Sequence, residues 1–123
     1  MKLENQVCSL ESAKRLKELS VNKDSLYYWY NCTDHPGEWR ITDIKLNNDL
    51  DKETSAYTVA ELGEMLPSGL VTSGRKYKDI FMCVYGNPEI DLVFKEEKTE
   101  AEARAKMLIY LLENNIIKAE DLK

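Results

Sequence analysis

The chain has 123 residues, a formal net charge of −5, three cysteines and one histidine. This length fits one domain, which we place at residues 1–123, and it is long enough to bury a single hydrophobic core. The acidic balance argues against direct nucleic-acid binding, because phosphate contacts need clustered Lys and Arg. The odd number of cysteines argues against a disulfide framework.

No apolar run approaches the roughly 18 residues that a membrane-spanning helix needs. The longest run, at residues 107–112, is much shorter. The first residues also lack the apolar core of a signal peptide. We therefore expect a cytoplasmic protein without a membrane partner.

The first predicted helix begins at Ser9 and ends near Leu19, because apolar residues recur there at helical spacing and Ser9 can cap the start. An aromatic strand is predicted next, at residues 26–30. Successive strand side chains point to opposite faces. Leu26, Tyr28 and Tyr30 therefore share one face, and Tyr27 and Trp29 share the other. If the first and last helices both cover the face of Tyr28, then Tyr27 and Trp29 lie on the side away from them.

A second strand is predicted at residues 39–44, joined to the first by a long loop. Pro36 and Gly37 in this loop fit a type II turn, since proline presets φ and glycine supplies a positive φ. The resulting hairpin would place Trp39 beside the aromatic strand. Residues 45–55 are polar and rich in acids, and they are typical of a surface loop.

The second half of the chain predicts two helices and a second hairpin. Thr58 and Glu61 have the spacing of a capping box, and Pro67 ends the helix that follows. Strands are predicted at residues 79–85 and 90–94, with a short one at 70–72. In residues 79–85 both alternating faces are apolar, so this strand is expected to be central with both faces buried.

The last predicted helix begins at Thr99 with another capping box and ends near Asn114. Residues 107–112 are apolar nearly all round. One stripe must pack on the sheet, and we expect the remainder to meet another helix or another chain. The order α-β-β-α-β-β-α predicts an α+β domain: an antiparallel sheet of four to five strands with three helices, mostly on one side.

Cys32 and His35 are the candidates for a metal-binding or catalytic site. Their C-x2-H spacing could start a zinc site completed by Cys8 and Cys83, or Cys32 could act as a nucleophile with His35 as its base. Against this, a free cysteine in a buried strand behaves as a small hydrophobe. Two residues so close in a loop also rarely hold a reactive geometry. We expect no metal ion, no cofactor and no catalytic residue, with an enzyme or metal site in this loop as the alternative.

Aromatic side chains are the better candidates for binding, because Trp and Tyr dominate binding hot spots. Tyr27, Trp29 and Trp39 form one candidate partner-binding patch. Tyr110 and Leu111, on the apolar last helix, form another. For the first patch, the interpretation that we favour is that these aromatics belong to the core.

Three segments, one around each predicted helix, carry a resemblance: residues 7–19, 57–67 and 99–114. They resemble small uncharacterised proteins of bacteriophages, prophages and related mobile elements. The resemblance brings no known activity, cofactor or catalytic residue. It implies a bacterial cytoplasm and a phage-encoded accessory role.

We therefore expect a small non-enzymatic binding or interaction protein of mobile-element origin, which binds an unknown protein partner or associates with itself. One alternative is the enzyme or metal site at Cys32 and His35. Another is an acidic inhibitor of a host nucleic-acid enzyme. The inhibitor requires that the acids cluster on one face: Asp49 to Glu53, Glu61, Glu64 and Glu96 to Glu102.

Overall fold

A computed structural model describes residues 2–31, 37–43, 53–67, 71–78, 80–87 and 90–122. The elements in these residues are, in chain order, the 3-10 turn η1 (Leu3–Asn5), α1 (Leu10–Glu18), β1 (Tyr28–Asn31), β2 (Trp39–Thr42), β3 (Glu53–Ser55), α2 (Val59–Met65), β4 (Val71–Tyr77), β5 (Ile80–Asn87), β6 (Ile90–Glu97), α3 (Glu100–Glu113) and the 3-10 turn η2 (Ala119–Asp121). Among the described residues, none of the helices has both the length and the apolar character that a bilayer crossing requires.

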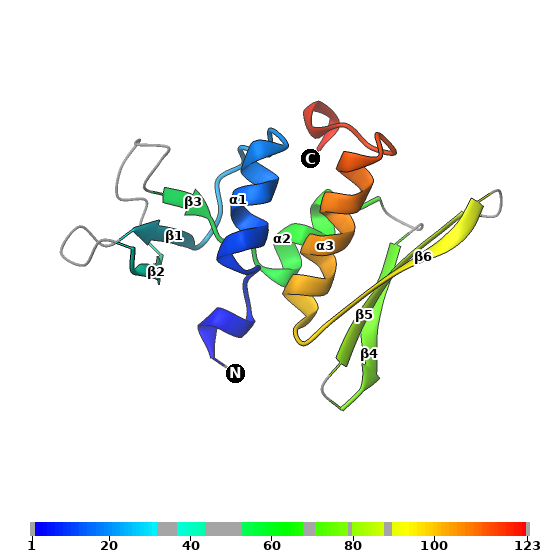
Figure 1. Cartoon of the computed structure of the whole chain (residues 1–123), viewed down its shortest axis with the longest axis horizontal. Helices are drawn as coiled ribbons and strands as arrows, with labels where there is room; N and C mark the ends of the chain where they lie inside the picture. Colours follow the sequence, from blue (N-terminus) through cyan, green and yellow to red (C-terminus); the bar gives the residue numbers. More distant parts are fainter. Residues whose placement is uncertain are drawn as a thin grey trace.

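The helices lie between two antiparallel sheets (Figure 1). One sheet has the strand order β2-β1-β3, and the other has the order β4-β5-β6. Helix α1 contacts the first sheet, whereas α3 contacts the second sheet on one side and α1 and α2 on the other. The core is therefore the helical layer, with α3 at its centre.

The α+β class with three helices is confirmed for the described residues, but the single sheet of four to five strands is not. The difference from the expected single sheet begins at β3, which lies in a segment that we expected to be a surface loop. Strand β3 pairs antiparallel with β1, with Trp29 opposite Thr54, so β1 has a neighbouring strand on each edge. The second hairpin then has no free edge of β1 to join. Because α3 is apolar nearly all round, it buries both of its sides and separates the two sheets.

All three helix starts lie where the sequence predicts them. The Ser9 side chain accepts a first-turn backbone N–H at 3.1 Å, and Thr58 with Glu61 forms a complete capping box. At α3, the Thr99 hydroxyl accepts from the Glu102 backbone N–H at 3.1 Å. The Glu102 carboxylate accepts from the Ser9 backbone N–H at 3.4 Å, which ties the start of α3 to the start of α1.

The core of the described residues is built mainly by the three helices. Its largest completely buried hydrophobic side chains are Tyr57, Leu16, Leu62, Met107, Leu108 and Leu111. Burying a side chain of this size stabilises the fold by about 1.5–3 kcal/mol. The apolar residues around α3 are therefore buried by other elements of the same chain.

Strand β5 is central in its sheet, as predicted. Cys83 and Tyr85 are buried on the face towards α3. Ile80, Met82 and Val84 alternate with them and are only half-buried. The expectation that both faces are buried is thus met on one face only, because the helical layer covers the sheet from one side.

Arg104 of α3 links α3 to α2 across a glycine. Its Nη1 donates to the Val59 carbonyl at 2.8 Å, and its Nη2 donates to Glu100 Oε1 at 3.1 Å. A Cβ atom at Gly63 would collide with Arg104 Nη1. Because glycine has no Cβ atom, the guanidinium of Arg104 can lie over α2 at this position.

Candidate functional site

The aromatic strand turns its tryptophan towards the helices. Trp29 Nε1 donates to the Cys8 carbonyl at 3.0 Å, and Thr54, opposite Trp29, donates its hydroxyl to a backbone carbonyl of α1 at 3.4 Å. Lys14 of α1 places its Nζ 4.6 Å from the centroid of the Trp39 ring. Trp29 also packs against the hydrophobic core, as the interpretation of these aromatics as core residues predicts. These contacts bind the sheet to α1.

The other face of this strand, which carries Tyr28, is reached by polar groups. Leu26 is 67% exposed. Its backbone N–H donates to Glu61 Oε2 at 3.2 Å, and the Ser25 hydroxyl donates to Glu61 Oε1 at 2.7 Å. Tyr28 is buried, and its hydroxyl accepts from the Ser25 backbone N–H at 3.2 Å. Through these hydrogen bonds, Glu61 fixes the position of the backbone just before β1. The position of this segment in turn determines which face of β1 packs against α1.

The remaining candidate binding residues differ in exposure. Tyr27 precedes β1 and is half-buried. Leu111 is completely buried, so it offers no surface to a partner. Tyr110 is half-buried and lies beside β6, where Lys95 Nζ is 4.7 Å from the centroid of its ring. Tyr110 also lines a groove.

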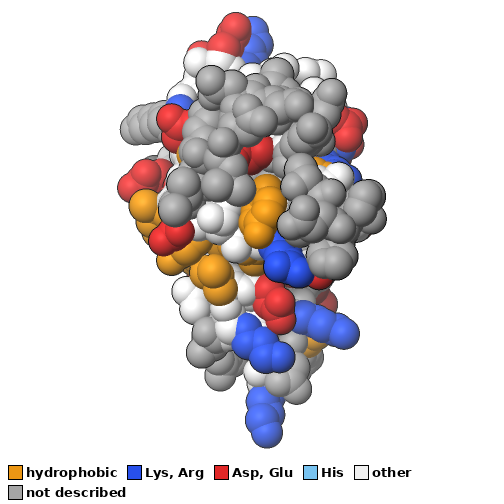
Figure 2. Space-filling view, turned by 90° about the vertical axis from the view of Figure 1, so that its left-hand side faces the viewer, with side chains coloured by type: hydrophobic (Ala, Val, Ile, Leu, Met, Phe, Trp, Pro, Cys, Tyr) orange, Lys and Arg blue, Asp and Glu red, His pale blue; other side chains and the backbone are white. Residues whose placement is uncertain are grey.

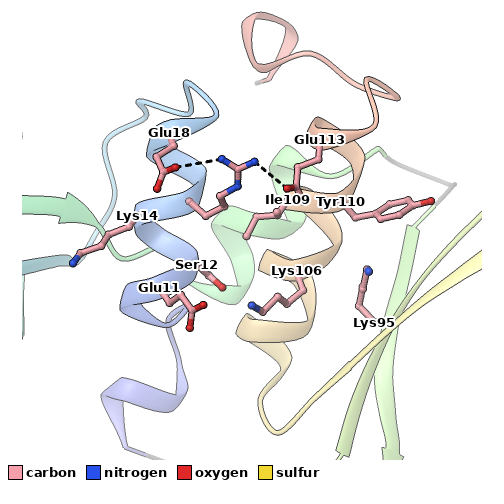
Figure 3. Close-up of a pocket in the computed structure, with 10 residues that line it drawn as sticks. Glu11, Ser12, Lys14, Glu18, Lys95, Lys106, Ile109, Tyr110 and Glu113 are labelled. Carbon is pink, nitrogen blue, oxygen red and sulfur yellow. Dashed lines mark hydrogen bonds and ion pairs between the residues drawn. The ribbon is translucent and has the colours of Figure 1, made fainter.

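This groove lies between α1 and α3 and has a volume of about 470 Å³ (Figure 3). Arg15 of α1 crosses it, with Nη2 2.9 Å from Glu113 Oε2 of α3 and Nη1 3.3 Å from Glu18 Oε2. The hydrogen bond to Glu113 raises the pKa of Arg15 above its ordinary value. One guanidinium therefore engages two of the carboxylates that line the groove.

Three lysines and a third acid, Glu11, line the same groove with no ion pair to another described residue, and Lys14 lies over the Trp39 ring. Lys106 extends from α3 towards α1, and Lys95 of β6 lies against Tyr110 (Figure 3). Ser12 also lines the groove and is 1% exposed. Its hydroxyl has no hydrogen-bond partner within the described ranges. The groove thus combines free positive charge, an aromatic wall and an unused hydroxyl.

The two described cysteines have no reactive character. Burial raises the pKa of the Cys8 thiol to about 12 and that of the Cys83 thiol to about 11. Both are therefore protonated near neutral pH, and a thiolate is the form that attacks or binds metal. The described residues hold no group of three or more metal-binding side chains. Cys32 and His35 lie outside the described residues.

Sequence patterns could not identify most of this groove. Tyr110 was selected because the last helix is over-apolar, but Arg15 and Glu113 are 98 positions apart and carry no local signal. Comparisons with known protein families, curated proteins and solved structures find no match for this chain. The groove's own chemistry is therefore the basis for a function.

Proposed function

We propose that this protein is a small non-enzymatic binding protein whose α1–α3 groove receives an acidic segment of a protein partner. The charge pattern of the groove is the observation that carries the proposal. Arg15 engages Glu18 and Glu113, whereas Lys95 and Lys106 have no acid within ion-pair distance among the described residues. Among the described residues, four cationic and three acidic side chains line the groove, so its lining carries a small positive excess on a chain whose formal net charge is −5.

Tyr110 gives this groove an aromatic contact beside Lys95. Aromatic residues in such positions are frequent hot spots, worth about 2 kcal/mol or more when truncated. Each exposed ion pair adds only about 0.2–1 kcal/mol. Affinity would thus come mainly from packing on Tyr110, and the lysines would select acidic partners and speed their association.

A different protein fits this groove better than a second copy of the chain. The apolar surface of α3, which would have supported self-association, is covered by α1, α2 and the second sheet. The exposed large hydrophobic residues of the described part are Leu26 and Ile116, which belong to different segments. On the face shown in Figure 2, the hydrophobic side chains in view form a small group beside charged ones.

The proposed setting is the bacterial cytoplasm, as an accessory protein of a phage or related mobile element. The support for this setting is the resemblance carried by the three helical segments. Binding without catalysis suits such a role because one accessible groove is enough to capture a host or phage protein. The cytoplasmic setting also supplies the acidic protein segments that the groove would select.

Photo-crosslinking from the groove tests the proposal. A photoreactive phenylalanine analogue replaces Tyr110 in one variant and the exposed Lys118, after α3, in the control. In a bacterial lysate, we expect a discrete protein adduct from position 110 that position 118 does not form. The adduct should map to an acidic segment of the captured protein. Equal adducts from both positions, or none from position 110, would contradict the proposal.

Two other functions remain open as alternatives. The enzyme or metal site at Cys32 and His35 predicts a reactive Cys32 thiol or bound metal in the purified protein. The acidic-inhibitor alternative needs acids free on one face. Glu53 is only 8% exposed, the Glu61 carboxylate accepts three hydrogen bonds, and Glu100 pairs with Arg104. Because these acids are engaged within the chain, the groove is favoured over the inhibitor.

A further inference from the structure

A second hollow, separate from the α1–α3 groove, lies where α3 begins. Its volume is about 500 Å³, within the range typical of small-molecule sites. Val59 at the start of α2 and Ile80 and Phe81 of β5 give it an apolar lining. These residues come from two elements that the core holds in place, since Val59 and Phe81 also pack against the hydrophobic core.

The charges around this hollow are unequal. Lys78 and Lys98 line it, are exposed and have no ion-pair partner among the described residues. Glu100, the acid that lines it, is paired with Arg104 at 3.1 Å. The Thr99 hydroxyl is also occupied, because it accepts from the α3 backbone at 3.1 Å. The hollow therefore offers an apolar lining and two free positive charges.

We propose that this hollow binds a small amphipathic carboxylate, with an unbranched aliphatic chain on Val59, Ile80 and Phe81 and its carboxylate between Lys78 and Lys98. Charge complementarity favours this occupant over a neutral one, because two lysines line the hollow and its one acid among the described residues, Glu100, is paired with Arg104. The apolar lining favours it over a fully hydrated anion, because burying each CH₂ group contributes favourable free energy. The site is independent of the partner groove.

Decanoate is the probe, and its binding is measured by isothermal titration calorimetry against the purified full chain. Decanol and decyltrimethylammonium keep the chain and change the head charge, whereas octanoate and acetate keep the head and shorten the chain. We expect binding of decanoate and weaker binding of octanoate, by about fourfold for each CH₂ removed. Decanol, decyltrimethylammonium and acetate should bind at least tenfold more weakly than decanoate.

The double variant Lys78→Gln with Lys98→Gln removes both charges from exposed positions, so the fold should be kept. Decanoate should bind it about tenfold more weakly, as expected for two exposed ion pairs near the upper end of their usual strength. Lys118→Gln is the matched control, and Lys106→Glu tests separation from the partner groove; both should bind decanoate like the parent chain. The proposal is overturned if decanoate fails to bind, if decanol binds equally well, or if the double variant binds like the parent.

Discussion

Replacing Gly63 with alanine tests how α2 and α3 are held together. Alanine is the better helix former, by about 0.8–1.0 kcal/mol, so helix propensity alone predicts that Gly63→Ala stabilises the fold. The structure predicts the opposite. The new Cβ would displace Arg104 Nη1, which donates to the Val59 carbonyl at 2.8 Å, and would disturb its pairing with Glu100 at 3.1 Å.

The magnitude follows from those two hydrogen bonds. The hydrogen bond from the charged Arg104 to the Val59 carbonyl is worth about 1.5–3 kcal/mol, and the i,i+4 pair with Glu100 adds about 0.3–0.5 kcal/mol. Their loss outweighs the gain in propensity and leaves a net destabilisation of about 1–3 kcal/mol. In an Arg104→Ala background the obstacle is absent, and the same Gly63→Ala change should stabilise by up to about 1 kcal/mol. The sign of the effect should thus reverse between the two backgrounds.

Urea unfolding followed by circular dichroism measures all four chains of this double-mutant cycle. The expected result is a lower free energy of unfolding for Gly63→Ala alone and a higher one when it is added to Arg104→Ala. A stabilising effect of similar size in both backgrounds would refute the reasoning. It would mean that the guanidinium moves aside at no cost.

Three further changes test other parts of the account. Ser12→Ala removes a buried hydroxyl without a partner among the described residues. It should therefore raise the unfolding free energy by about 1 kcal/mol, and a loss of stability in urea would show that the hydroxyl is satisfied. Glu61→Ala leaves the Leu26 and Thr58 backbone N–H groups without their acceptor, and should cost about 2–3 kcal/mol in the same assay. Burial raises the pKa of Cys8 from 9.0 to about 12, so the folded state prefers the protonated thiol. Its contribution to stability is fully present below pH 9 and is lost as the pH rises towards 12, and Cys8→Ala should flatten the fall in unfolding free energy above pH 9. An unchanged alkaline fall in Cys8→Ala would contradict this assignment.

The helices could be predicted because their signals are local. Ser9, Thr58 and Thr99 each cap a helix through a backbone N–H three residues later, which is a spacing that the sequence displays directly. Strand β3 could not be found in this way. Its three residues are polar and show no alternation, and they form a strand only because β1 supplies a partner with the matching register.

Local sequence patterns also could not predict which face of the aromatic strand packs against α1. Period-two alternation separates the faces of β1 but does not say which face meets α1. That choice depends on Glu61, which holds the Leu26 backbone from 35 positions away, and on the Cys8 carbonyl, which accepts from Trp29. The α1–α3 groove is non-local for the same reason, since its two walls come from opposite ends of the chain.

The central claim is that Lys95 and Lys106 select an acidic partner segment at the α1–α3 groove. Quantitative affinity capture from a bacterial lysate, with the parent chain, the Lys95→Glu/Lys106→Glu variant and the Lys118→Glu control, tests it most directly. The account predicts a partner that is retained by the parent and the control, lost from the groove variant and released by added salt. Equal recovery of the same proteins by all three chains would contradict it.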